Sequence, residues 1–189
     1  EEITDAILIM NLLNQTKYMI QTNEVKLYSL EYDEAKTWLA ALCFIAGNIL
    51  LPQLAHLVPQ GGITWLPIYF FTLVGAYKYG WRVGLLTAIA SPAVNSLLFG
   101  MPLVASLPAI LLKSVLLALF AGWAASRSGK ASLGMLLAVV LAYQITGTLG
   151  EWAMKGNFYL AMQDFRIGIP GMLLQWFGGW TVINYLIRK

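Results

Sequence analysis

Six long apolar stretches, each almost free of charge, dominate this sequence of 189 residues. A helix that crosses a bilayer needs about 20 apolar residues, and the stretches reach or approach that length. They cover residues 37–57, 63–77, 81–99, 103–126, 131–153 and 168–187. Because none of them alternates polar and apolar residues as barrel strands do, the sequence predicts an all-α integral membrane protein, a bundle of six transmembrane helices.

Charged residues are too scarce to cover the surface of a soluble domain. They make up 11% of the chain, against about 25% in typical soluble proteins. The formal net charge of +3 is small and spread along the chain. The sequence therefore predicts membrane lipid as the surroundings and no nucleic-acid partner.

Lysines and arginines mark every second loop between these stretches. Lys78 and Arg82 lie between the second and third, and Arg127 and Lys130 lie between the fourth and fifth. The first and third loops carry no cation, and the chain ends in two more. The fifth loop, residues 154–167, mixes both signs and is placed outside by parity. Because cations concentrate in cytoplasmic loops, we expect both termini in the cytoplasm.

The first 36 residues differ from the rest of the chain. They contain seven acidic residues and three lysines, so they do not form a span. Residues 7–13 are apolar on more than one side, which allows either a short amphipathic helix on the membrane or part of a mobile tail. We divide the chain into an N-terminal cytoplasmic segment, 1–36, and a six-helix membrane domain, 37–189.

Small residues recur every fourth position along the fifth span. A stripe of this kind lets another backbone approach closely, and we expect a second helix of the same chain there rather than a second protein. The stripe consists of Gly134, Ala138, Ala142, Thr146 and Gly150. Cys43 and Gly47 form a shorter pair of the same kind in the first span.

Lys113 lies about eleven residues into the fourth span, too deep to reach the membrane surface easily. A lysine at that depth requires an anionic partner. Glu151, toward the outer end of the fifth span, is the candidate within the chain, and a ligand carboxylate or phosphate is the alternative. Both readings stay open at this point.

Amides and aromatic residues gather in the outer half of the predicted bundle, together with Pro92 near the end of the third span. A pocket with aromatic walls and a few polar groups is how small-molecule sites are built. Single aromatic residues more often anchor a helix at the membrane surface, and the proline alone could serve only packing. With Lys113 and Glu151, the candidate substrate-binding residues are Asn48, His56, Asn95, Tyr143, Gln144, Trp152, Gln175 and Trp176.

Signatures of catalysis are missing from the sequence. It contains no Walker-type GxxxxGK[ST] and no HExxH. A single histidine and a single cysteine cannot complete a metal site by themselves. We therefore expect no catalytic residues, no metal and no catalytic cofactor, so the chain is predicted not to be an enzyme.

One segment resembles a known family. The sequence LPIYFFTLVGAYKYGWRVGLLTAIASP, followed by Asn95 and by an FGMP corner that opens the fourth span, is similar to the S components of energy-coupling factor (ECF) vitamin transporters. The resemblance covers about residues 36–189. It implies six helices with both ends inside, in a bacterial cell (plasma) membrane.

The resemblance also implies a function. An S component captures a vitamin or related micronutrient, its transported cargo, on the extracellular side. Loops 57–62, 98–103 and 154–168 would close over it, and toppling in the membrane would release it. A transmembrane coupling subunit and two cytoplasmic ATPases would complete the transporter. One departure is that Cys43-xxx-Gly47 stands where many members have Ala-xxx-Ala for docking the coupling subunit.

Two other functions remain open from the residues alone. The chain could be a membrane scaffold or assembly protein whose polar groups serve only packing. It could also be an integral membrane enzyme, with Lys113 and Glu151 as its acid–base pair.

Overall fold

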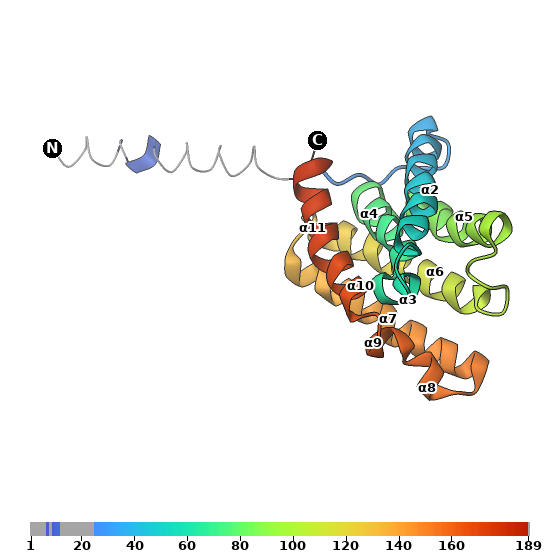
Figure 1. Cartoon of the computed structure of the whole chain (residues 1–189). Helices are drawn as coiled ribbons and strands as arrows, with labels where there is room; N and C mark the ends of the chain where they lie inside the picture. The colour runs from blue at the N-terminus through green and yellow to red at the C-terminus, as the bar shows by residue number, and fades with distance from the viewer. Residues whose placement is uncertain (1–6, 8, 12–24, 189) are drawn as a thin grey trace.

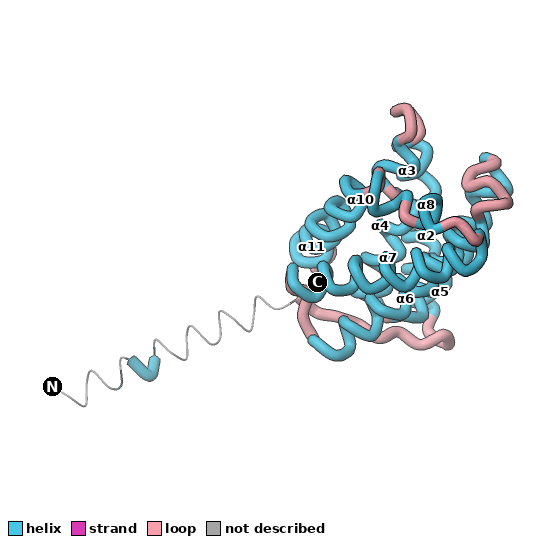
Figure 2. The backbone as a smooth tube through the Cα atoms, turned by 90° about the horizontal axis from the view of Figure 1, so that it is seen from below, coloured by secondary structure: helices cyan, strands magenta, loops and turns pink. Residues whose placement is uncertain are grey.

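A computed structural model describes residues 7, 9–11 and 25–188. The described residues form helices and loops without a strand (Figures 1 and 2), which confirms the all-α prediction. Among these residues, four helices are long and apolar enough to cross a membrane. They are α2 (Ala35–Ala55), α5 (Trp81–Phe99), α6 (Leu107–Ser128) and α7 (Leu133–Lys155).

The second and sixth predicted spans are helical but interrupted, so the count of six spans stays a prediction. The second consists of α3 (Gly61–Trp65), the 3₁₀ turn η1 (Pro67–Tyr69) and α4 (Phe70–Tyr79). Leu66 separates α3 from η1 in the left-handed region, with a φ of 46° and a ψ of 45°. The proline that follows disfavours a continuation of the α-helix at this residue. The sixth consists of α10 (Ile169–Leu173), η2 (Leu174–Gly178), α11 (Gly179–Thr181) and η3 (Val182–Leu186), with π-helical turns in η2 and η3.

Large apolar side chains on α2 remain exposed, which suits a lipid environment better than water. They include Leu39, Leu42, Leu50 and Leu54, each more than half exposed. This helix packs on α4 and α5 with its other face. The exposure is compatible with a protein embedded in a membrane.

The cation-bearing loops meet at one end of the molecule, which we call the basic end (Lys78, Arg82, Arg127, Lys130 and Arg188). The Tyr77 hydroxyl donates to the Lys130 carbonyl over 2.9 Å, and Lys78 Nζ donates to the Arg188 carbonyl over 3.2 Å. These bonds join the α4–α5 and α6–α7 connections to the C-terminal end of the chain. Two short helices, α8 (Phe158–Ala161) and α9 (Gln163–Arg166), lie at the opposite end.

Residues 25–34 run as an extended segment over the basic end. The Tyr28 and Leu30 amides donate to the carbonyls of Lys78 and Tyr79 over 2.8 and 3.1 Å. Of the predicted surface helix 7–13, residues 7 and 9–11 are helical and exposed, and the others lie outside the described residues. The division of the chain at residue 36 stays a prediction.

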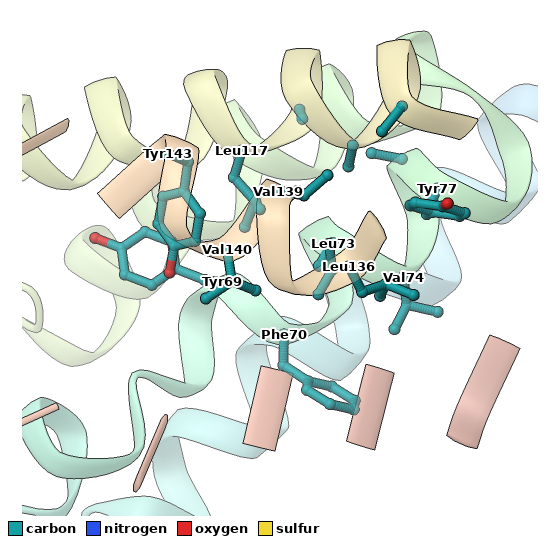
Figure 3. Packing of buried hydrophobic residues seen from close by; sticks show 14 of the residues in the cluster. Tyr69, Phe70, Leu73, Val74, Tyr77, Leu117, Leu136, Val139, Val140 and Tyr143 are labelled. Carbon is teal, nitrogen blue, oxygen red and sulfur yellow. The ribbon is translucent and has the colours of Figure 1, made fainter. Parts of the chain in front are cut away.

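Helix α4 is the centre of the core. Its residues 72–78 are all buried, and α5, α6 and α2 pack around them. Figure 3 shows the Tyr69 and Tyr143 rings together at one end of the apolar cluster and Tyr77 at the other. Tyrosine side chains thus lie at both ends of the core, and aliphatic side chains lie between them.

The stripe of small residues on α7 is only partly covered by the rest of the molecule. Gly134, Ala138 and Thr146 are exposed, while Ala142 and Gly150 are half-buried. The buried face of α7 instead includes Leu136, Val140, Tyr143, Gly147 and Glu151. The stripe meets a second helix of the same chain at Gly150, where a Cβ would lie 2.4 Å from Leu112 Cδ2 on α6, whereas nothing lies within 4 Å of a Cβ at Gly134. Contact between the exposed part of the stripe and another protein stays a prediction.

The two residues of the shorter pair on α2, Cys43 and Gly47, also differ in their surroundings. Cys43 is exposed, whereas Gly47 packs inside, because a Cβ there would lie 2.7 Å from the Phe71 ring. Gly47 is thus a packing residue between α2 and α4. An interface with a partner at Cys43 stays a prediction.

The contact between α5 and α6 depends on Gly122. An ideal Cβ at this position would lie 2.5 Å from Trp81 Cβ and 2.8 Å from Trp81 Cα. Backbone atoms cannot move aside as a side-chain tip can, so we expect Gly122→Ala to lower the free energy of unfolding by about 2 kcal/mol. Gly134→Ala is the matched control, because nothing lies within 4 Å of a Cβ there, and it should leave stability unchanged or slightly raised. Equal losses in melting temperature would contradict this packing.

Candidate functional site

Lys113 is the centre of a buried ion cluster that joins three elements. Its Nζ lies 2.6 Å from a Glu151 oxygen on α7 and 2.8 Å from Asp164 Oδ2 on α9. Glu151 also pairs with Lys155 over 2.6 Å, one turn along α7. The lysine is 2% exposed and Glu151 8%. The Lys113–Glu151 pair, one of the two alternatives left open by the sequence, is therefore present, with a second carboxylate added.

A glycine on α7 makes room for the lysine. A Cβ at Gly147 would lie 2.5 Å from Lys113 Cγ, so the aliphatic stem of Lys113 crosses the helix at this notch. Gly147 and Glu151 are one turn apart and share a face. The notch therefore directs the ammonium group toward the carboxylate.

A second polar group adjoins this cluster around Tyr143. The Tyr143 hydroxyl donates to Gln175 Oε1 over 2.6 Å and accepts from Gln144 Nε2 over 3.0 Å. The Tyr69 ring lies 5.6 Å from the Tyr143 ring, and Figure 3 shows the two side by side. The stem of Lys113 crosses α7 at Gly147, one turn after Tyr143. The structure therefore brings five predicted residues together: Lys113, Tyr143, Gln144, Glu151 and Gln175.

Four buried polar atoms in this region have no hydrogen-bond partner in the described structure. They are Ser114 Oγ, Gln144 Oε1, Thr148 Oγ1 and Gln175 Nε2. Buried polar groups are nearly always hydrogen-bonded in native proteins. Four such atoms on α6, α7 and η2 therefore indicate missing partners.

Asp164, Ser114 and Thr148 were missed by the sequence analysis, although weak signals for each existed. Ser114 directly follows Lys113, and Thr148 lies one turn after Gln144. Asp164 belongs to the loop of mixed charge.

Asn48 and Asn95 belong to a different network that the protein itself completes. Asn48 Nδ2 donates to Thr72 Oγ1 over 3.0 Å, and its Oδ1 accepts from the Phe71 amide over 3.1 Å. Asn95 Nδ2 donates to the Asn48 and Ser91 carbonyls, each over 2.9 Å. Among the described residues, no hydrogen bond or ion pair links these amides with the Lys113 cluster. They connect α2, α4 and α5.

Helix α5 continues through Pro92 to Phe99, and Asn95 is fully buried. The bond from the Asn95 amide to the Ser91 carbonyl lies next to the proline. Pro92 and Asn95 thus lie in a packed part of this helix.

The remaining predicted residues lie apart from the Lys113 cluster. His56 is exposed beside Gly62, and Trp152 is 45% exposed against the Phe158 ring. Trp176 donates to the Leu133 carbonyl over 2.8 Å. It also lines an open apolar groove of about 220 Å³ between α7 and α10. None of the three joins the polar atoms described above.

The site is thus a neutral ion cluster next to two tyrosine rings and four unpartnered polar atoms. In the described part of the chain, no group of three or more His, Cys, Asp or Glu side chains is arranged to hold a metal ion. Comparison with known proteins found no family model, no curated protein and no solved structure that matches this chain.

Proposed function

We propose that this chain is the substrate-binding subunit of an ECF-type transporter, which captures a vitamin or related micronutrient for uptake driven by partner ATPases. In this proposal it crosses the plasma membrane six times, with both termini in the cytoplasm. The interrupted second and sixth spans count as crossings. A transmembrane coupling subunit and two ATPases are its partners.

The orientation follows from the basic end. Cations on three chain segments gather there, and cytoplasmic loops are enriched in lysine and arginine. The basic end therefore faces the cytoplasm in this proposal, and α3, α8, α9 and the start of α6 face outward. The Lys113 cluster then lies in the outer half of the membrane, where an extracellular ligand arrives.

The single observation that carries the proposal is the set of four buried, unpartnered polar atoms on α6, α7 and η2, two of which belong to glutamines bonded to Tyr143. Each of these groups costs about 1–3 kcal/mol when its hydrogen bond is unmade, so four of them together favour a site that a bound partner completes. A ligand-binding protein has a reason to retain such groups, since the ligand supplies the partners. This favours binding over a purely structural role.

The test is to purify the protein in detergent, identify released small molecules by mass spectrometry, and measure melting temperature against a vitamin panel. We expect one stoichiometric compound that also raises the melting temperature, with the logarithmic dependence on concentration that binding to the folded state requires. An empty protein that no vitamin stabilises would overturn the proposal.

One observation favours the scaffold as a second candidate. The stripe Gly134, Ala138 and Thr146 faces outward on α7, where it offers a close-approach surface to another membrane helix. A scaffold would co-purify with a protein partner in stoichiometric amount and would lose that partner when Ala138 is replaced by a large residue. It would bind no vitamin.

A further inference from the structure

The charges around Lys113 already balance without a ligand. Two cations, Lys113 and Lys155, face two carboxylates, Glu151 and Asp164, over 2.6–2.8 Å. An anionic ligand would have to displace a carboxylate from Lys113 or add an uncompensated negative charge to a largely buried cluster, and both are costly. A cationic ligand would meet carboxylates that the two lysines already occupy.

The buried groups that lack a hydrogen-bond partner are all uncharged. Gln175 Nε2 offers a donor, Gln144 Oε1 an acceptor, and the hydroxyls of Ser114 and Thr148 can act as either. These are the groups that recognise amides, lactams and hydroxyls.

Three of the four atoms are linked through α7, and the fourth belongs to the residue after Lys113. Gln144 and Gln175 both bond to the Tyr143 hydroxyl. Thr148 follows Gln144 by one turn on the same buried face of α7. Ser114 adjoins Lys113, whose stem crosses α7 at Gly147, between Gln144 and Thr148. A single small molecule is therefore the simplest common partner.

Two tyrosine rings complete the surroundings. Tyr69 is 3% exposed and Tyr143 fully buried, with their planes tilted by 52°. Aromatic side chains contribute large flat apolar surfaces that favour planar rings.

We propose that the cargo is an uncharged, ring-containing compound bearing hydrogen-bond donors and acceptors, held by Ser114, Gln144, Thr148 and Gln175. Lys113 holds Glu151 and Asp164 in place and does not pair with a charge on the cargo. This inference rests on the proposed function, because it assigns the class of ligand for that same site.

The first test compares matched compounds that differ by a negative charge: nicotinamide with nicotinate, riboflavin with its phosphate, and pyridoxine with its phosphate. We expect any compound that stabilises the protein to be the neutral member, with a Kd at least tenfold below that of its charged partner. We also expect any molecule released on purification to be neutral. A preference for the charged member, or a charged released molecule, overturns this inference while the proposed function stands. No bound molecule and no stabilisation by any compound overturns both.

The second test uses Thr148→Val, which removes the unpartnered hydroxyl and keeps the shape of the side chain. We expect the ligand-free variant to melt at a higher temperature than the wild type, since a buried group without a partner is lost. Its affinity for the compound identified above should fall at least fivefold.

Thr87→Val is the matched control on α5. The Thr87 hydroxyl is also buried but donates to the Val83 carbonyl over 2.9 Å. We expect this variant to keep the wild-type affinity and to gain no stability. If Thr148→Val leaves affinity unchanged, or lowers the melting temperature of the ligand-free protein, the assignment of Thr148 to the ligand is wrong.

Discussion

Replacing Lys113 with methionine is expected to lower the free energy of unfolding by about 3–4 kcal/mol, because removal of one partner strands buried opposite charges. Glu151 retains Lys155, but Asp164 has no other ion-pair partner among the described residues. The loss should appear as a lower melting temperature in detergent. It should also free the α9 segment, which will raise hydrogen exchange at its backbone amides.

The control is the triple variant Lys113→Met, Glu151→Gln and Asp164→Asn. It removes the charges on both sides, and exchanging a buried ion cluster for neutral groups of similar volume is often close to neutral. We therefore expect the triple variant to be more stable than Lys113→Met alone. A triple variant that is less stable than every single variant would show that the charges do not act as one cluster.

Replacing Asn48 with alanine is expected to cost about 2–3 kcal/mol of stability without loss of ligand, since buried groups left unpaired cost about 1–3 kcal/mol each. The change removes the acceptor for the Phe71 amide and the donor to Thr72. The measurements are the melting temperature and the amount of bound compound per folded molecule.

Gln53→Ala is the control for this variant. Gln53 is half-buried and makes a single side-chain hydrogen bond in the described structure, to Asn95 Oδ1 over 3.3 Å. The stability lost in Gln53→Ala should therefore be well below that lost in Asn48→Ala. If Asn48→Ala instead abolished binding while stability stayed unchanged, Asn48 would belong to the ligand site.

The helical class and the first, third, fourth and fifth apolar helices could be predicted because length and hydropathy are properties of the sequence alone. The third span, 81–99, has the bounds of α5. The interruption at Leu66 was harder to place. Pro67 was visible, but its effect on the chain depends on how α3 packs against α10.

The candidate site could be predicted only in part, because chemically similar residues differ in the partners that packing supplies. Asn48 and Gln144 are both amides in apolar helices. Helices α4 and α5 supply hydrogen-bond partners for the Asn48 side chain, whereas Gln144 Oε1 has none in the described structure. Ser114 and Thr148 were missed because hydroxyls in helices usually bond to the preceding turn. The contact of Asp164 with Lys113 depends on the path of the chain between α7 and α10, which the periodicity of the sequence does not determine.

The small-residue stripe shows a related limit. A period of four positions identifies a smooth face but not which way it points. The buried face of α7 follows the neighbouring positions Leu136, Val140, Tyr143 and Gly147 instead. Only the packing of α6 against α7 distinguishes the two faces.

The bond between Asn48 and the Phe71 amide has a consequence for biosynthesis. In lipid, a backbone N–H without an acceptor is costly, and Phe71 lies at the start of α4, just after the break at Leu66. The ribosome makes α2 first, so in the proposed membrane topology the acceptor is already in place when α4 emerges. Ser91 and Asn95 follow on α5 and complete the network. In that topology the chain order lets α4 insert as the partner of a helix that is already there, and its interrupted span does not have to enter lipid alone.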